Sequence, residues 1–314
     1  MRLELRVPFV FVLAVGTACR PVAPAIGPTS ASASSLEADI DTLASRAFAG
    51  REAGTAGADS AADFLARRYQ HLGLRGAFHS DCNSAGHCQP TYFGPFQIAR
   101  GSGHNVGAMI PGTQPSGPRE FVVIGAHFDG LGHSPTWALD RDAGFVMRPG
   151  ADDNASGTAA VLGLARRLQE RPTKRSILFY NFDAEEEGRV GSRALFVVDP
   201  LVARESMVFM LNLDMVGRLR DDRLFIEGNP LDSRVRAVFD SAAKAVGVHL
   251  EFIASDGRSD DASFAEAGIA AAELSTGYHA DYHTASDIPA RLNVEGLRRV
   301  VDFAEFVVRR IADR

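Results

Sequence analysis

The sequence predicts an α/β fold in which a mixed, largely parallel central sheet lies between helices on both faces. Four short runs rich in β-branched and aromatic residues are apolar almost throughout, which is typical of strands buried on both faces of a sheet. Segments with the helical spacing of apolar residues lie between or after these runs, and strands that alternate with helices favour a parallel sheet. We expect one domain with three layers, because the sequence shows no internal repeat and no second linker.

The composition is that of an ordinary globular protein. The chain has 314 residues, of which 46% are hydrophobic and 23% are charged, and these values exclude a disordered or collagen-like chain. The 33 basic and 39 acidic residues leave a net charge of -6. Such a balance provides no broad basic surface for nucleic acid or for an anionic membrane, so we expect small partners and no nucleic acid.

The first 19 residues have the form of a secretory signal peptide. Arg2 and Arg6 precede an apolar run over residues 7–18, which is too short to span a bilayer as a helix of the mature protein. Cys19 ends the string GTAC, which resembles a bacterial lipoprotein processing site and makes Cys19 a candidate lipid anchor. Residues 20–34 are rich in Pro, Ala and Ser and predict a flexible linker. We therefore expect an exported protein, periplasmic or extracellular, with a lipid anchor as an option.

The other two cysteines, Cys82 and Cys88, lie six residues apart in DCNSAGHC. In an exported protein this spacing favours a disulfide that closes a small loop. Two free thiols and a metal site that includes His87 are the alternatives. No second pair of ligands supports the metal site.

The folded domain is expected over residues 35–314 and begins with two helices. Ser34 and Glu37 have the form of a capping box, and apolar residues then recur at helical spacing. A second helix is predicted over residues 58–72 and is stopped by Gly73. The four strands follow, and three further helices are expected between or after them. The strands are predicted over residues 105–110, 121–126, 176–182 and 207–213, and the helices over residues 156–170, 231–246 and 292–311.

Polar side chains follow three of these strands directly. His127 and Asp129 follow the second strand, an acidic run that includes Glu185 and Glu186 follows the third, and Asp214 follows the fourth. In open α/β sheets ligands bind outside the carboxyl ends of the strands, so we expect these groups to converge on one edge of the sheet. Acids gathered at one edge repel one another unless a cation lies among them.

Two loop segments add further polar groups. Asp152 and Asp153 lie in the Gly-rich string GADDNASGT before a helix, where Asp153 or Asn154 could serve as the cap, but two adjacent acids exceed what a cap requires. His283 follows an apolar run and has Asp287 four residues on, just as His127 has a carboxylate two residues on. A metal-bound imidazole usually donates its other ring N–H to such an acceptor. A surface or packing role is expected for the other histidines: His71, His79, His87, His104, His133, His249 and His279.

Taken singly, each motif also fits a structural role, but the ordered set is more specific. The strings HFDGLG, GADDNASG, AEEEGRVGS, NLDMVG and YHTASD resemble the secreted co-catalytic zinc aminopeptidases. That family includes bacterial leucyl aminopeptidase and aminopeptidase Y, with glutamate carboxypeptidases and glutaminyl cyclases as relatives. The likeness extends from about Leu36 to the C-terminus, because GREAGTAGADSAADFLARRYQHLGL resembles the N-terminal helical region of the family. The resemblance implies the zinc-exopeptidase fold.

The resemblance also implies a centre of two zinc ions. His127 and Asp214 would bind one ion, Glu186 and His283 would bind the other, and Asp152 would bridge the two. A strained, non-proline cis peptide is implied after Asp152. Imidazole and carboxylate groups suit zinc, and the set contains no thiolate.

The implied activity is hydrolysis of the N-terminal peptide bond of peptides or small proteins. Two zinc ions bring four positive charges and the three carboxylates bring three negative ones, so a bridging hydroxide would make the centre neutral. Glu185 would be the general base that takes the proton of the bridging water and later protonates the leaving amine. Tyr282 could donate to the oxyanion.

The sequence departs from the family pattern at one place. Many members have His after the H-x-D motif, where this chain has Gly130, and residues 131–150 form a local variation that contains Trp137. The ligands should be unaffected, whereas the rim of the substrate site should differ.

Three other functions are compatible with the same motifs. A glutaminyl cyclase of this fold would use one working zinc, although a complete set for two metals argues against it. A carboxypeptidase is possible because the metal groups do not say which peptide terminus is held. A catalytically silent binding ectodomain is the alternative outside the enzymes. The chain contains neither a G-x-S-x-G elbow nor an H-E-x-x-H helix, so serine hydrolase and thermolysin-like chemistry are not expected.

Overall fold

The computed structural model describes residues 33–79, 89–114, 119–197, 202–228 and 232–314. The predicted signal peptide and the three cysteines, with their predicted lipid anchor and disulfide, lie outside the described residues, as does nearly all of the predicted linker. No helix in the described ranges combines the length and the apolar character that a membrane span requires.

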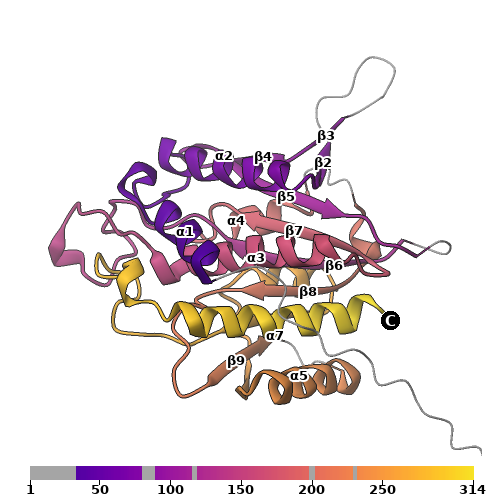
Figure 1. The fold of residues 1–314 in the computed structure, drawn as a ribbon. Coiled ribbons are helices and arrows are strands. Elements are labelled where there is room, and N and C mark those ends of the chain that lie inside the picture. Colours follow the sequence, from indigo (N-terminus) through magenta and orange to yellow (C-terminus); the bar gives the residue numbers. More distant parts are fainter. Residues whose placement is uncertain (1–32, 80–88, 115–118, 198–201, 229–231) are drawn as a thin grey trace, which may run out of the picture.

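A nine-stranded mixed sheet forms the centre of the molecule (Figure 1). Its strands are β1 (Arg75–Gly76), β4 (Phe93–Ile98), β5 (Gly101–Ile110), β6 (Phe121–His127), β7 (Ser176–Phe182), β8 (Met207–Leu213), β9 (Arg223–Gly228), β10 (His249–Ala254) and β11 (Ala271–Ser275). Their order is β1-β5-β7-β6-β8-β11-β9-β10, with β4 paired to β5. The central strands β7, β6, β8 and β11 are parallel, whereas β5 runs antiparallel to its neighbours and β9 antiparallel to β11. A separate pair is formed by β2 (Phe78–His79) and β3 (Pro90–Thr91).

Helices cover both faces of this sheet, so the predicted three-layer α/β sandwich is confirmed (Figure 1). One face carries α1 (Ala33–Leu43), α2 (Ala56–His71), α3 (Gly157–Glu170), α5 (Ser233–Val246) and α7 (Val294–Ala312). The other face carries the short helices α4 (Val190–Ala194) and α6 (Asp261–Glu266). The short helical turns are η1 (Arg46–Phe48), η2 (Arg141–Ala143), η3 (Ala151–Ser156), η4 (Arg204–Ser206) and η5 (Pro289–Arg291).

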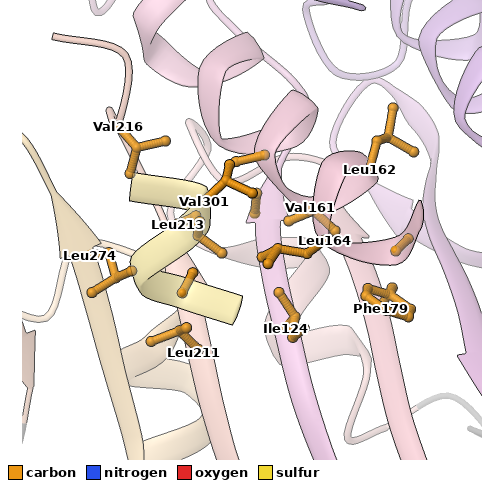
Figure 2. Packing of buried hydrophobic residues seen from close by; sticks show 14 of the residues in the cluster. Ile124, Val161, Leu162, Leu164, Phe179, Leu211, Leu213, Val216, Leu274 and Val301 are labelled. Atoms are coloured by element: carbon orange, nitrogen blue, oxygen red, sulfur yellow. The ribbon is translucent and has the colours of Figure 1, made fainter. Parts of the chain in front are cut away.

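Alternation along the strands builds two cores. Even-numbered residues of β6 such as Ile124 pack with Phe179 of β7 against Val161 and Leu164 of α3 and Val301 of α7 (Figure 2). The odd-numbered residues of β6 face the other side, where a smaller core lies under α4 and α6. Burying one such side chain contributes about 1.5 to 3 kcal/mol. The larger core therefore fixes the strands whose ends carry the polar groups.

The apolar runs located the central strands to within a few residues. The helix α1 begins at Ala33, so Ser34 lies inside the helix and does not precede it, and residues 33 and 34 of the predicted linker are helical. The strands β9, β10 and β11 were not predicted. Their residues are mixed in polarity or rich in alanine, which is a weak strand former.

Candidate metal centre

The loops after β6, β7, β8 and β11 meet at one edge of the sheet, as the sequence predicts. His127 is the last residue of β6, Glu186 lies in the turn after β7, Asp214 follows β8, and His283 lies in the loop after β11. The chain leaves β6 through α3 to β7 and returns through α4 to β8 on the opposite side of β6. This is a topological switch point, where open α/β sheets bind their ligands.

Five side chains form two groups that share Asp153. The Nε2 atom of His127 lies 3.3 Å from Asp153 Oδ1 and 3.4 Å from Asp214 Oδ1. The Nε2 atom of His283 lies 3.1 Å from Asp153 Oδ2 and 3.1 Å from Glu186 Oε2. Each oxygen of Asp153 therefore faces a different imidazole.

The two groups have the dimensions and chemistry of divalent metal sites. Zinc binds nitrogen and oxygen ligands at about 2.0 to 2.2 Å in a tetrahedral arrangement, so two ligands of one ion lie about 3.3 Å apart. The separations of 3.1 to 3.4 Å match this spacing. Within each group the three potential ligand atoms all lie within 4.8 Å of one another. The residues therefore fit two adjacent zinc ions.

The structure corrects one residue of the predicted set, because Asp153 and not Asp152 lies between the imidazoles. Asp152 Oδ1 accepts a hydrogen bond from Gly217 N at 2.7 Å, and its Oδ2 lies 3.1 Å from His279 Nε2. The backbone of Asp153 is extended at φ -105° and ψ 94°, so that adjacent side chains point in different directions. The cis peptide also lies one residue later than implied, between Asp153 and Asn154.

A buried ion-pair network fixes the loop that carries Asp153. Asp287 Oδ2 accepts hydrogen bonds from the backbone N–H groups of Asp152 and Asp153 at 2.9 and 3.0 Å. Its other oxygen accepts from Arg218 at 2.8 Å, and Arg218 also donates to Asp281 at 2.6 Å. Asp287 thus positions the loop and is not the acceptor for His283 that the sequence predicts.

The acceptor for His283 comes from the segment that departs from the family pattern. His283 Nδ1 lies 3.0 Å from the carbonyl oxygen of Trp137. The Trp137 side chain is exposed, and Trp137 and Glu186 both line a cavity of about 300 Å³. The close approach of Gly50 explains Gly130, since a Cβ at position 130 would lie 2.9 Å from the Gly50 carbonyl oxygen. A histidine at that position would clash with the backbone.

The carboxylate predicted as the acceptor for His127 lies beside its imidazole ring. Asp129 is fully buried, and its Oδ1 lies 3.4 Å from His127 Nδ1. The same carboxylate accepts hydrogen bonds from the backbone N–H groups of Glu185 at 3.0 Å and Glu186 at 3.2 Å. Asp129 therefore orients one imidazole and the acidic turn together.

The buried carboxylates of the candidate metal centre favour bound cations. Burial lowers the pKa of His127, but Asp214, Asp129 and Asp153 outweigh this effect and raise it well above the usual value. Burial, with Asp153 as the next cause, raises the pKa of Glu186 to about 7. The protein on its own thus holds protons among these groups, and divalent ions would take the place of the protons.

Glu185 and Tyr282 border the centre without joining either group. Burial raises the pKa of Glu185 well above its usual value, and its charged neighbours include His127, Glu186 and Asp214. The ring of Tyr282 stacks on His283 with centroids 3.8 Å apart. Burial, with Asp153 and Glu186 nearby, raises the pKa of the Tyr282 hydroxyl, which therefore keeps its proton.

Sequence reasoning missed four residues that support the centre. Arg51 and Arg218 hold its loops, His279 contacts Asp152, and Ser259 Oγ donates to Asp214 Oδ2 at 2.7 Å. The expectation of a surface or packing role for His279 is therefore incomplete. None of these residues follows a predicted strand, which was the signal that found His127, Glu186 and Asp214.

Comparison with known proteins shows the family to which the chain belongs. Residues 105–308, more than half of the chain, match peptidase family M28, and the chain belongs to that family. The predicted resemblance to zinc aminopeptidases is therefore confirmed at the level of the family. Aminopeptidase YwaD of Bacillus subtilis is 32% identical over 200 residues, which cover 60% of this chain and 40% of that protein. The chain spans less than half the length of the first curated relatives it matches.

Solved structures share the fold. The zinc aminopeptidase BSAP from Bacillus subtilis has a TM-score of 0.69 and 19% identity, covering 89% of this chain and 95% of that chain. Bacteroides thetaiotaomicron glutaminyl cyclase bound to N-acetylhistamine also has a TM-score of 0.69 and 19% identity, with 88% and 97% covered. At these identities the likeness establishes the fold alone.

Proposed function

We propose that the chain is a metallo-aminopeptidase that holds two zinc ions and hydrolyses the N-terminal peptide bond of peptides or small proteins. Membership of peptidase family M28 supports peptide hydrolysis. The observation that carries the two-metal site is the position of Asp153, whose two oxygens lie 3.3 Å and 3.1 Å from different imidazoles.

The ligand assignment follows these contacts. His127 and Asp214 would hold one ion, Glu186 and His283 would hold the other, and Asp153 would contribute one oxygen to each. Zinc bound there would polarise the scissile carbonyl and lower the pKa of water to about 7.

Glu185 would move the protons of the reaction. It belongs to neither ligand group among the described residues, so its carboxylate is available to accept a proton from the attacking water and to pass it to the leaving amine. Tyr282 stacks on His283, and its protonated hydroxyl can donate a hydrogen bond to the oxyanion that develops on the carbonyl.

Glu185→Gln tests the base. General acid–base catalysis contributes about 10² to 10⁴-fold, so kcat for leucyl anilide should fall by at least about 100-fold while the zinc content stays near that of the wild type. Glu187→Gln is the matched control, because Glu187 lies two residues further on in the same acidic run and pairs with Arg100 at 2.6 Å. Near-normal turnover in Glu185→Gln would remove Glu185 from this role, and hydrolysis that persists in a chelator would contradict the metal-dependent proposal.

Cyclisation of N-terminal glutamine is the second candidate, because a glutaminyl cyclase shares the fold. A glutamine-initiated peptide separates the two reactions. Hydrolysis yields free glutamine and a peptide shortened by one residue, whereas cyclisation releases ammonia and keeps the number of residues. Mass spectrometry of the products decides between them.

A further inference from the structure

Acidic side chains lie beside the metal centre on the face of the sheet that α6 covers. Glu273 of β11 is the register partner of Glu227 on β9 and of Asn212 on β8, two residues before Asp214. Because alternate residues of a strand face the same side, Asp214, Glu227 and Glu273 share one face. The residues next to them face the main core on the other side: Leu213, Ile226 and Leu274.

The segment that leads into α6 contacts these strands. Asn212 Nδ2 donates to Ser259 Oγ at 2.8 Å, and Ser259 Oγ donates to Asp214 Oδ2 at 2.7 Å. Asp261 lies two residues further on and is 1% exposed. Within the described chain, neither carboxylate oxygen of Asp261 has a hydrogen-bond partner.

Among the residues that the structure describes, no cation compensates the charges of Glu227, Asp261 and Glu273, which we call the acidic cluster. Glu273 is 8% exposed, and no described residue forms an ion pair or a hydrogen bond with its carboxylate. Arg258 acts on Glu227, but its side chain is 74% exposed and pairs with Asp256 at 3.2 Å. Burial raises the pKa of Glu227 and of Asp261 to about 7 and that of Glu273 well above its usual value, and neighbouring carboxylates add to each shift.

We propose that the acidic cluster binds the basic side chain of an N-terminal lysine or arginine of the substrate. The inference rests on the proposed function, which places the peptide bond of that residue at the metal centre. Asp214 belongs to that centre and shares its sheet face with Glu273 one strand away and Glu227 two strands away. Strands lie about 4.8 Å apart and residues about 3.3 Å apart along a strand, and Glu273 pairs with Asn212, two residues before Asp214, so the backbones of Glu273 and Glu227 lie about 8 Å and about 12 Å from that of Asp214. The long, flexible stem of a basic side chain suits this distance.

The spacing of the acids favours an organic cation over a metal ion. In the described residues only two groups bring three potential ligand atoms within 4.8 Å, and both belong to the metal centre. The acidic cluster therefore does not form the compact cage that a small ion requires. A guanidinium or ammonium group can instead donate several hydrogen bonds to separated carboxylates.

The test compares substrates on the metal-loaded full chain. We measure kcat/KM for the arginine, lysine and leucine amides of 7-amino-4-methylcoumarin in the wild type, in Glu273→Gln and in Glu227→Gln, with the metal content of each protein. The wild type should favour arginine or lysine over leucine by at least about tenfold, and each substitution should reduce that ratio by about tenfold or more. Glu251→Gln is the matched control, because it removes a partly exposed carboxylate from the neighbouring strand β10, and it should keep the ratio.

The outcomes separate this inference from the proposed function. Hydrolysis of the leucine amide without a preference for basic residues, or a ratio unchanged in Glu273→Gln, overturns the inference and leaves the aminopeptidase intact. If no amide is hydrolysed, calorimetric titration with L-argininamide and L-leucinamide tests the cluster directly. Tighter binding of argininamide that Glu273→Gln abolishes supports the cluster, and equal binding overturns it. A bound calcium ion that Glu273→Gln removes would also overturn it.

Discussion

Arg51 joins the backbone that follows His127 to the backbone that precedes Asp153, and its removal is expected to weaken both the fold and the metal centre. The guanidinium is fully buried and donates four hydrogen bonds to backbone carbonyl groups. Its acceptors are Phe128 at 2.6 Å, Leu43 at 2.7 Å, Pro149 at 2.8 Å and Gly150 at 2.9 Å.

The magnitude follows from two opposing contributions. A hydrogen bond from a charged donor contributes about 1.5 to 3 kcal/mol, so the four together contribute at least about 6 kcal/mol. Burial lowers the pKa of the Arg51 guanidinium to about 10, although Asp129 and other carboxylates raise it in part. At about 1.4 kcal/mol per pKa unit, that lowering corresponds to a cost of about 3 kcal/mol. Arg51→Met should therefore reduce the free energy of unfolding by about 3 kcal/mol or more.

Equilibrium unfolding in urea at pH 7.5, with circular dichroism as the signal, measures the effect. A loss of about 3 kcal/mol also corresponds to a decrease in Tm of roughly 6 to 12 °C. Arg67→Met is the matched control, because the Arg67 side chain is 58% exposed and lies 3.8 Å from Asp63, and such pairs contribute about 1 kcal/mol or less. If Arg51→Met unfolds within about 1 kcal/mol of the wild type, the carbonyl bonds do not carry the stability assigned to them.

Three further predictions concern the centre and the N-terminus. Asp153→Asn should lower zinc affinity by more than about 100-fold, whereas Asp152→Asn should retain its zinc through dialysis. Metal analysis of the two dialysed variants measures this difference. Zinc lost from Asp152→Asn and retained by Asp153→Asn would show that Asp152 is the bridging ligand. Asp129→Asn should weaken zinc binding by about 10 to 100-fold through the imidazole it orients, and an unchanged affinity would contradict that role. Cys19→Ser should move the expressed protein from the membrane fraction to the soluble fraction if Cys19 carries a lipid, and a wild type found only in the soluble fraction would refute the anchor.

The sequence predicted the central strands and most of the groups at their ends because both depend on local pattern. A residue that directly follows a buried strand, such as Asp214, is fixed by the strand itself. The choice between Asp152 and Asp153 depends instead on the path of an irregular turn, which adjacent identical side chains do not reveal. Arg51 reaches the centre from the N-terminal region through contacts more than 70 positions away in sequence, and no periodic pattern signals such a bond.

The acidic cluster could not be predicted from local sequence pattern, because its residues come together only in the folded sheet. Glu227 and Glu273 lie on strands whose composition gave no strand signal, and in sequence they are isolated acids 46 positions apart. Antiparallel pairing of β9 with β11 places them side by side, and parallel pairing of β11 with β8 places Glu273 next to the strand of Asp214. In the proposed function, the ends of the parallel strands hold the scissile peptide bond. We infer that the side chains of the flanking strands select the N-terminal residue, so substrate preference can change while the metal ligands stay the same.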